Sequence, residues 1–232
     1  MRVTAIILAA GEGRRVGGKV SKSYLPIAGR AMVLRTLDRM FSAQTVDRVV
    51  LVVAASELAR CDSLLRGDRE LKDRPWSLQS GGATRQQSAQ RGLQCVAPET
   101  DIVIIHDGAR PFVSAALIDR CVQAAAEKGA VVVGLPVRDT VKVVSPNGLI
   151  RSTPERSGLW EIQTPQVFRR ELIVAAHEKA QSENAQVTDD AMVVERIGEP
   201  VYVLEGERYN FKITMPEDIW LAEALIRAGK LA

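Results

Sequence analysis

Cysteine and histidine are scarce in this sequence of 232 residues, and neither forms a recognisable cluster. The three cysteines, Cys61, Cys95 and Cys121, are an odd number and contain no Cys-x-x-Cys pair. The two histidines, His106 and His177, lie far apart. The sequence therefore predicts neither a disulfide framework nor a zinc cluster, and it favours a reducing environment such as the cytoplasm.

Long apolar runs and a strong net charge are also missing. The early apolar run from Ala5 to Ala10 is shorter than the core of a signal peptide and far too short to span a bilayer. The formal net charge is only +3, so neither a membrane nor a nucleic acid is expected as a partner. Cations do gather near the start of the chain, at Arg14, Arg15, Lys19, Lys22, Arg30 and Arg35. This local cluster favours a small anionic ligand, although composition alone leaves a general role in solubility open.

Apolar runs of strand length alternate along the chain with segments of helical periodicity. Predicted strands cover Val3–Leu8, Arg48–Val53, Ile102–Ile105, Ala130–Leu135 and Pro200–Glu205. Predicted helices cover Ala31–Ala43, Ser56–Leu65, Thr84–Val96, Ser114–Lys128, Arg169–Ser182, Asp189–Ile197 and Met215–Ala228, the last capped by Thr214. Continuous apolar strands between helices are typical of a parallel sheet that is covered on both faces. We therefore predict an α/β fold with a doubly wound sheet, in a single domain of residues 1–232.

One segment, Val137–Trp160, interrupts the alternation because it has no helical period. Its centre contains the pair Asn147-Gly148, which is a strong signal for a hairpin turn. A hairpin about this turn places Thr140 opposite Glu155 and next to Arg156. We therefore predict a protruding β-arm at about 137–160. Because a solitary hairpin is only marginally stable in water, we expect a second copy of the chain to cover it, which makes a homodimer.

A glycine-rich, cationic loop follows the first predicted strand, from Ala9 to Lys22. Its sequence is Ala9-Ala10-Gly11-Glu-Gly13-Arg-Arg15-Val-Gly-Gly-Lys-Val-Ser-Lys22. The dinucleotide-binding pattern fails because it needs glycine in place of Val16, and the P-loop pattern fails because it needs Ser or Thr in place of Val20. A mobile surface loop is the plainer explanation. Glycines and cations after a buried strand nevertheless favour phosphate binding at the carboxyl edge of the sheet.

A second candidate site is the run His106-Asp107-Gly-Ala-Arg110-Pro, which directly follows another predicted strand. Its carboxylate, Asp107, emerges at the same edge of the sheet, where it could hold magnesium or the hydroxyl groups of a substrate. An isolated run of this kind is usually a turn with a surface ion pair at Arg110. His106 is still in phase with the strand, and we expect it to be structural.

Further polar groups gather late in the chain, in Gln163-Thr164-Pro-Gln166, Thr188-Asp-Asp190 and Asn210-Phe-Lys212-Ile-Thr214. Each motif alone is a weak signal. Thr188 and Thr214 can be explained as helix N-caps, and Lys212 as a charge on an edge strand. No Ser-His-Asp arrangement stands out, so covalent catalysis is not predicted.

Together, the motifs closely resemble those of 2-C-methyl-D-erythritol 4-phosphate cytidylyltransferases, over nearly the whole chain. The matching motifs are Ala9-Ala-Gly-x-Gly-x-Arg15 with Lys22, Gly81-Gly82 with Arg85 and Ser88, HDGARP, PVRDT, GLWxxQTPQ, TDD and NFKITxPED. The resemblance implies a Rossmann-like nucleotidyltransferase fold with a mostly parallel, twisted sheet. It also implies a homodimer that exchanges β-arms, and a magnesium-dependent reaction between CTP and methylerythritol phosphate.

The resemblance also implies roles for individual residues. Catalytic cations would be Arg15, Lys22 and Lys212. Nucleotide-binding residues would be Ala9, Ala10, Gly11, Gly13, Gly82, Ser88 and Asp107. Acceptor-binding residues would be Asp107, Arg110, Thr140, Arg156, Thr164, Thr188 and Lys212, with Thr140 and Arg156 supplied by the partner's arm. Asp107 is also the candidate magnesium ligand. The chain departs from the family pattern at Ala83, where many members carry an acidic residue, and this weakens any ribose contact there.

Two other functions remain open at this point. A ribitol 5-phosphate cytidylyltransferase would use a similar fold and an acceptor that also carries a phosphate and hydroxyl groups. A non-catalytic nucleotide-binding module would keep the loop but lose turnover. We favour direct in-line displacement by the acceptor phosphate, since its oxygen is already ionised and fixed cations would offset the repulsion between the two anions.

Overall fold

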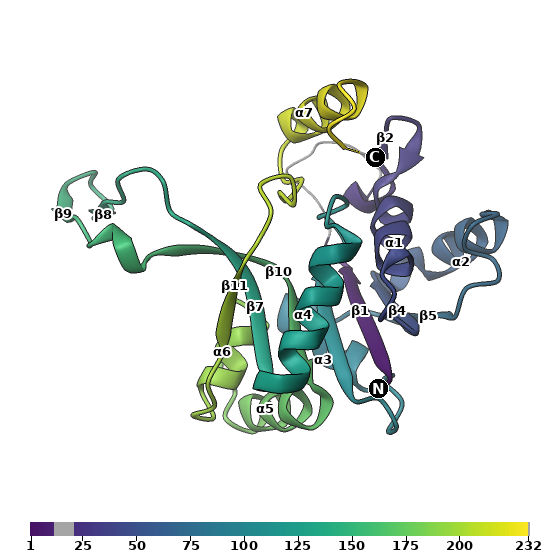
Figure 1. The fold of residues 1–232 in the computed structure, drawn as a ribbon, viewed down its shortest axis with the longest axis horizontal. Coiled ribbons are helices and arrows are strands. Elements are labelled where there is room, and N and C mark those ends of the chain that lie inside the picture. The colour runs from purple at the N-terminus through teal and green to yellow at the C-terminus, as the bar shows by residue number, and fades with distance from the viewer. Residues whose placement is uncertain (12–20, 232) are drawn as a thin grey trace.

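The computed structural model of the protein describes residues 1–11 and 21–231, and the following account is confined to them. Its centre is a seven-stranded sheet with the strand order β11-β7-β10-β6-β1-β4-β5 (Figure 1). The strands are β1 (Val3–Ala9), β4 (Arg48–Val53), β5 (Trp76–Ser80), β6 (Ile102–Asp107), β7 (Ala130–Pro136), β10 (Trp160–Arg169) and β11 (Tyr202–Glu205). Within this sheet β10 runs antiparallel to both of its neighbours, whereas the other pairs are parallel.

Helices cover both faces of the sheet, as predicted. One face carries α1 (Met32–Ser42), α2 (Leu58–Gly67) and α4 (Ala115–Lys128), and the other carries α3 (Arg85–Leu93), α5 (Arg170–Ser182) and α6 (Asp190–Glu195). Successive side chains of a strand point to opposite faces. Ile7 of β1 therefore packs in the first core, and Ile6 packs in the second. Because both residues are fully buried, β1 is almost continuously apolar rather than alternating.

Two strands of the seven-stranded sheet were not predicted from the sequence, and both lack a continuous apolar run. β5 is short and only partly buried along its length, with two serines and a glutamine among its five residues. β10 contains Gln163, Thr164 and Gln166, which are buried polar residues in the middle of the sheet. Polar residues are rarely buried without specific partners, and those partners are distant in the sequence. The sequence therefore predicted the end of the arm at Trp160 and the start of the next helix at Arg169. It predicted no strand for the ten residues Trp160–Arg169, which form β10.

The predicted arm is present and projects from the body of the molecule (Figure 1). Its tip pairs β8 (Val143–Val144) with β9 (Ile150–Ser152), and the pairing of Val143 with Ser152 has the predicted register. Toward the turn the register shifts between Val143 and Val144, and in the other direction β8 begins at Val143, so the ladder does not reach Thr140. Arg156 instead begins the 3-10 helix η4 (Arg156–Gly158), and its guanidinium donates to the backbone carbonyl of Arg138 across the arm.

The last helix, α7 (Pro216–Arg227), lies above the carboxyl edge of the sheet beside β2 (Pro26–Ile27) and β3 (Arg30–Ala31). Two short 3-10 helices, η2 (Lys22–Tyr24) and η3 (Ala55–Glu57), complete the described elements. The predicted cap of α7 is wrong: the capping position is Met215, and Asp218 accepts hydrogen bonds from the backbone N–H groups of Thr214 and Met215. No helix in the described ranges is long and apolar enough to cross a membrane.

Candidate active site

A cleft of about 940 Å³ opens at the carboxyl ends of β1 and β6, beside the start of α3. Its described lining consists of Leu8, Ala9, Ala10, Gly11, Lys22, Ser23, Ala54, Gly82, Ala83, Thr84, Arg85, Ser88, Asp107, Ala109, Lys212 and Thr214. Parallel strands present ligand-binding groups at this edge because their connecting loops meet there. The cleft therefore brings together eight predicted site residues from five separate parts of the chain: Ala9, Ala10, Gly11, Lys22, Gly82, Ser88, Asp107 and Lys212.

One end of the cleft is built around two adjacent glycines. A Cβ atom on Gly81 would stand 2.3 Å from the Cβ of Ala10, and one on Gly82 would stand 2.4 Å from the Cβ of Gln87. The backbone therefore approaches its neighbours more closely than any larger residue allows. The N–H of Gly82 donates to the Ser88 hydroxyl over 3.1 Å, which fixes this turn to α3. Ala83 has no polar side chain to offer, and its N–H donates to the Gln87 side chain instead.

Asp107, the last residue of β6, lies among three cations. Its carboxylate oxygens are 2.7 Å from Lys212 Nζ, 3.2 Å from Arg85 Nε and 4.0 Å from Arg110 Nε. Burial alone would raise the pKa of Asp107, but Arg85, Lys212 and Arg110 outweigh it and hold the pKa well below its usual value. The carboxylate is therefore ionised at neutral pH.

Behind Asp107, a buried hydrogen-bonded chain fixes the strand end. The N–H of Asp107 donates to the Thr164 hydroxyl over 3.0 Å, and that hydroxyl lies 3.1 Å from His106 Nδ1. His106 Nε2 lies 3.0 Å from the carbonyl of Arg110, which can only accept. We therefore assign the proton to Nε2 and the acceptor role to Nδ1. His106 is fully buried, and burial lowers its pKa to about 4, so it is neutral and structural, as predicted.

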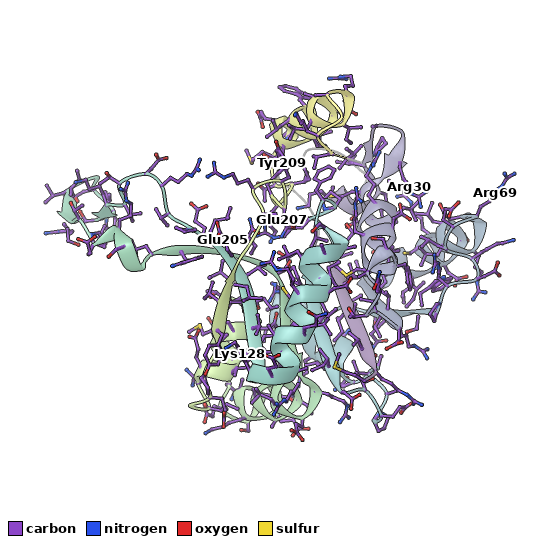
Figure 2. The ribbon with its side chains drawn as sticks, in the orientation of Figure 1. Arg30, Arg69, Lys128, Glu205, Glu207 and Tyr209 are labelled. Atoms are coloured by element: carbon purple, nitrogen blue, oxygen red, sulfur yellow. The ribbon has the colours of Figure 1, made fainter. Side chains whose placement is uncertain are left out.

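The segment after β11 supplies the other wall of the cleft. From Glu205, the last residue of β11, the segment runs past Glu207 and Tyr209 toward α7 (Figure 2). Further along, Lys212 reaches Asp107, and the carbonyl of Ile213 accepts a hydrogen bond of 2.7 Å from Lys22 Nζ. Lys22 and Lys212 thus come from opposite ends of the chain to the same cleft, and Lys212 lies in no strand, contrary to the edge-strand explanation.

Some predicted site residues do not line the cleft. Arg110 is largely buried, with Nη1 donating to the Asn210 carbonyl, and Thr164 is buried behind Asp107. Thr188 is exposed, and its hydroxyl faces the sulfur of Met192 at 3.9 Å. Asp189, rather than Thr188, caps α6. Neither Thr140 nor Arg156 is among the residues that line the cleft, and the arm to which they belong projects from the body of the molecule (Figure 1). Gly13 and Arg15 lie outside the described residues.

Two charged residues of the site received no role from the sequence. Arg85 lines the cleft and bridges Asp107 to Asp190, with Nη1 2.7 Å from the Asp190 carboxylate. Both Arg85 and Asp190 occur within the motifs that carry the family resemblance, which was the available signal. Their pairing joins residues 105 positions apart, and no local pattern reveals such a contact.

The described residues contain no group of three or more His, Cys, Asp or Glu side chains that could enclose a metal ion. Asp107 is the one carboxylate among the described residues of the cleft lining. A hard cation such as Mg²⁺ commonly takes one or two carboxylates together with the phosphate oxygens of a substrate. An ionised Asp107 fits that mode of binding.

Comparison with known proteins gives consistent results. The sequence model of the 2-C-methyl-D-erythritol 4-phosphate cytidylyltransferase family matches residues 3–228. Proteins of that name are 43% identical over 230 residues in Geobacter metallireducens, covering 98% of each chain, and 44% identical over 233 residues in Geobacillus kaustophilus, covering 100% of each.

Solved structures agree with the sequence comparison. The structure of 4-diphosphocytidyl-2C-methyl-D-erythritol synthase from Anaerococcus prevotii has a TM-score of 0.86 at 33% identity, over 97% of this chain and 96% of that one. The structure of 2-C-methyl-D-erythritol 4-phosphate cytidylyltransferase from Thermus thermophilus has a TM-score of 0.79 at 35% identity, over 98% and 100%.

Proposed function

Because this chain belongs to the 2-C-methyl-D-erythritol 4-phosphate cytidylyltransferase family, we propose that it transfers the cytidylyl group of CTP to 2-C-methyl-D-erythritol 4-phosphate. The products are 4-diphosphocytidyl-2-C-methyl-D-erythritol and pyrophosphate. An oxygen of the acceptor phosphate forms a bond to the α-phosphorus of CTP, and the bond from that phosphorus to the bridging oxygen of pyrophosphate breaks. No proton needs to move, because the attacking oxygen is already ionised at neutral pH.

The charge of the cleft is the observation that carries this proposal. Lys22, Arg85 and Lys212 line it, against the single carboxylate of Asp107 among its described residues. The two substrates are anions that repel one another, and fixed positive charge offsets this repulsion most strongly when the phosphates are closest. One well-placed electrostatic group is worth about 3 kcal/mol in such a transition state. His106 is buried and neutral, so it is not the base of the reaction.

The proposed roles follow the geometry of the cleft. The turn at Gly82 and Ser88 would receive the cytidine, and Lys22 would hold the triphosphate together with Arg15. Lys212 and Arg85 lie at the end of the cleft that Asp107 forms, where the acceptor phosphate would enter. Thr164, which is buried, and Arg110, which is largely buried, would hold this end of the cleft in place.

Magnesium is proposed as the metal cofactor, with Asp107 as its protein ligand beside the phosphates of CTP. When bound, the metal would neutralise phosphate charge and stabilise the departing pyrophosphate. Asp107 is suited to this because it is ionised, although Lys212 must then share the carboxylate or move to a phosphate oxygen.

We further propose a homodimer formed through the arm. Four large apolar side chains at its tip are exposed by about half of their area: Val143, Val144, Leu149 and Ile150. A patch of this kind usually marks a surface that another protein covers. Thr140 and Arg156 of the arm would then reach the acceptor in the second copy. Sedimentation should show a dimer, and mixing two inactive variants, Lys22→Ala and Arg156→Ala, should restore part of the activity because one complete shared site can form.

One assay tests the proposed function against its rivals. The protein is supplied with CTP and Mg²⁺, and pyrophosphate release is measured with methylerythritol phosphate or ribitol 5-phosphate as the acceptor. We expect release with methylerythritol phosphate. Turnover of ribitol 5-phosphate alone would reject the proposal in favour of the other acceptor, and inactivity with both would indicate a nucleotide-binding module. The cytoplasmic location stays a prediction from the cysteine content.

A further inference from the structure

A line of hydrogen-bonded polar and charged side chains runs from the interior of the protein to the floor of the cleft. His177 Nε2 lies 3.1 Å from one oxygen of Asp190, and the other oxygen of Asp190 lies 2.7 Å from Arg85 Nη1. Arg85 Nε then donates to Asp107 over 3.2 Å. The side chains of His177 and Asp190 are 3% and 1% exposed, so neither can touch a substrate.

Burying the carboxylate of Asp190 carries a considerable desolvation cost, and its partners compensate for it. Removing a charge from water costs several kcal/mol unless the charge is paired and hydrogen-bonded. Burial raises the pKa of Asp190, but Arg85 and His177 outweigh it and keep the pKa below its usual value. Since the Asp190 carboxylate can only accept, His177 Nε2 must carry the proton of that hydrogen bond.

The backbone holds Asp190 firmly in place. Asp190 is the first residue of α6, and its N–H donates to the side-chain oxygen of Gln166 over 2.9 Å. The N–H of Ala191 donates to the same oxygen over 3.2 Å. Gln166 is itself buried on β10, where it pairs with Ile105 of β6, two residues before Asp107. Asp190 and Asp107 are therefore tied to the same pair of strands, with Arg85 between them.

Arg85 is suited to transmit a position because its guanidinium is planar and rigid. Its Nε and Nη1 atoms bind different carboxylates, so fixing Asp190 sets the plane of the guanidinium, and that plane directs Nε toward Asp107. A lysine could satisfy one carboxylate but could not fix the angle between the two. Asp107 in turn holds Lys212, whose ammonium faces the cleft.

From this geometry we propose that Asp190 and His177 are positioning residues, which hold Arg85 and through it the Asp107 carboxylate at the acceptor end of the cleft. The proposal rests on the proposed function, because it concerns the placement of groups for that reaction. It predicts that loss of either buried residue lowers catalysis more than the accompanying loss of stability explains. A displacement of about 1 Å in a catalytic group can lower a rate on the order of a hundredfold.

The test compares matched variants of His177 in the full-length protein. In His177→Phe the ring keeps its approximate size but loses its donor, and in His177→Gln the amide nitrogen can replace Nε2. We expect kcat/KM for methylerythritol phosphate to fall tenfold to a hundredfold in His177→Phe, and to stay within about threefold of the unmodified protein in His177→Gln. Asp190→Asn should resemble His177→Phe. If Asp190→Asn does not fold, the two His177 variants decide the question alone.

Ile173→Ala is the control for a purely structural role. Ile173 is fully buried on the same helix, α5, and it belongs to the apolar core rather than to this line of hydrogen-bonded side chains. It should lower the melting temperature at least as much as His177→Phe while leaving kcat/KM within twofold. Equal losses of activity in the two variants, or unchanged kcat/KM in His177→Phe, would overturn the proposal.

A readout independent of turnover separates this proposal from the proposed function. In NMR spectra, the side-chain Nε–H proton of Arg85 should give a signal and exchange slowly with water. The signal is assigned by its disappearance in Arg85→Lys. We expect the slow exchange to be lost in His177→Phe and kept in His177→Gln. If the protein released no pyrophosphate with methylerythritol phosphate, the proposed function would fail while this resonance still tested the positioning. Slow exchange that survives in His177→Phe would refute the positioning itself.

Discussion

The buried neutral His106 predicts a specific dependence of stability on pH. The pKa of His106 is lowered by burial to about 4, against about 6.5 for an exposed histidine. Between these values the unfolded chain binds a proton that the folded protein excludes, so stability falls as pH falls from 6.5 toward 4 and is fully present above 6.5. One pKa unit corresponds to about 1.4 kcal/mol, so His106 should remove about 3 kcal/mol over this range.

The structure explains why protonation is unfavourable. His106 Nδ1 accepts from the Thr164 hydroxyl, and a proton there would place a second donor against it. The variant His106→Asn cannot titrate, and its amide oxygen can still accept from Thr164. It should be less stable than the unmodified protein at pH 7, but its stability should change less between pH 6.5 and 4.5, by about 2 kcal/mol.

Urea unfolding at several pH values measures this difference directly. The protein concentration must be held constant, because a dimer gains apparent stability with concentration. The comparison between the two proteins removes the contributions of other titrating groups that they share. Asp107 and Asp190 have lowered pKa values and so affect stability at still lower pH. Parallel stability curves for the two proteins would refute the assignment of His106 as a buried neutral residue.

Two further substitutions test the glycine turn beside the cleft and the start of α7. In Gly81→Ala, the new Cβ atom would lie 2.3 Å from the Cβ of Ala10 and 2.9 Å from Ser88 Oγ. We expect the affinity for CTP, measured by calorimetry, to fall at least tenfold. Unchanged affinity would show that the cytidine binds elsewhere. The Asp218 carboxylate accepts hydrogen bonds from the backbone N–H and the hydroxyl of Thr214, and Asp218→Asn removes its charge. We expect this variant to destabilise the start of α7 by about 1 kcal/mol in thermal unfolding. The difference should be smaller below the pKa of the carboxyl. An unchanged melting temperature would contradict that reading of the cap.

Local sequence patterns were sufficient to predict most of the fold. The apolar strands β1, β4 and β6 were predicted nearly to the residue, because a parallel sheet buries both faces of each strand. Helix α4 was equally clear, because the Ser114 hydroxyl accepts from the N–H of Leu117 at its start and Gly129 has a φ of 88° at its end. Each of these signals lies within a few residues of the feature that it predicts. The family resemblance stated from the motifs was confirmed by the comparisons.

The features that were missed depend on contacts between distant residues. β10 was not recognised because Gln163 and Gln166 look like loop residues until their partners, Asn210 and the start of α6, are in place. The hydrogen bond between the N–H of Asp107 and the buried Thr164 hydroxyl likewise joins residues 57 positions apart, and the contact of Thr164 with the acceptor stays a prediction. The residue type alone does not distinguish a glutamine in a core from one in a loop. Only the folded structure shows which of them has a hydrogen-bond partner.

Lys22 allows a catalytic role to be separated from a structural one. Its ammonium donates to the carbonyl of Ile213, and this contact ties Lys22, the last residue of the glycine-rich loop, to the segment that carries Lys212. A hydrogen bond from a charged group contributes about 2 kcal/mol to stability at most sites, and less where the donor can turn to water. Loss of a group that stabilises the transition state costs about a hundredfold to a thousandfold in turnover.

The two roles of Lys22 therefore predict different results for Lys22→Ala. If Lys22 holds the triphosphate, kcat should fall by at least a hundredfold, while the melting temperature falls by only a few degrees. If Lys22 serves only to tie Ile213 in place, the melting temperature should fall in the same way but turnover should stay within a few-fold of the unmodified protein. Lys22→Arg is the matched control, because it keeps the charge and can still donate to the carbonyl of Ile213. Partial activity in Lys22→Arg with almost none in Lys22→Ala would show that a cationic donor is required at this position, and a fall of only a few degrees in the melting temperature of Lys22→Ala would then assign that requirement to catalysis rather than to the tie to Ile213.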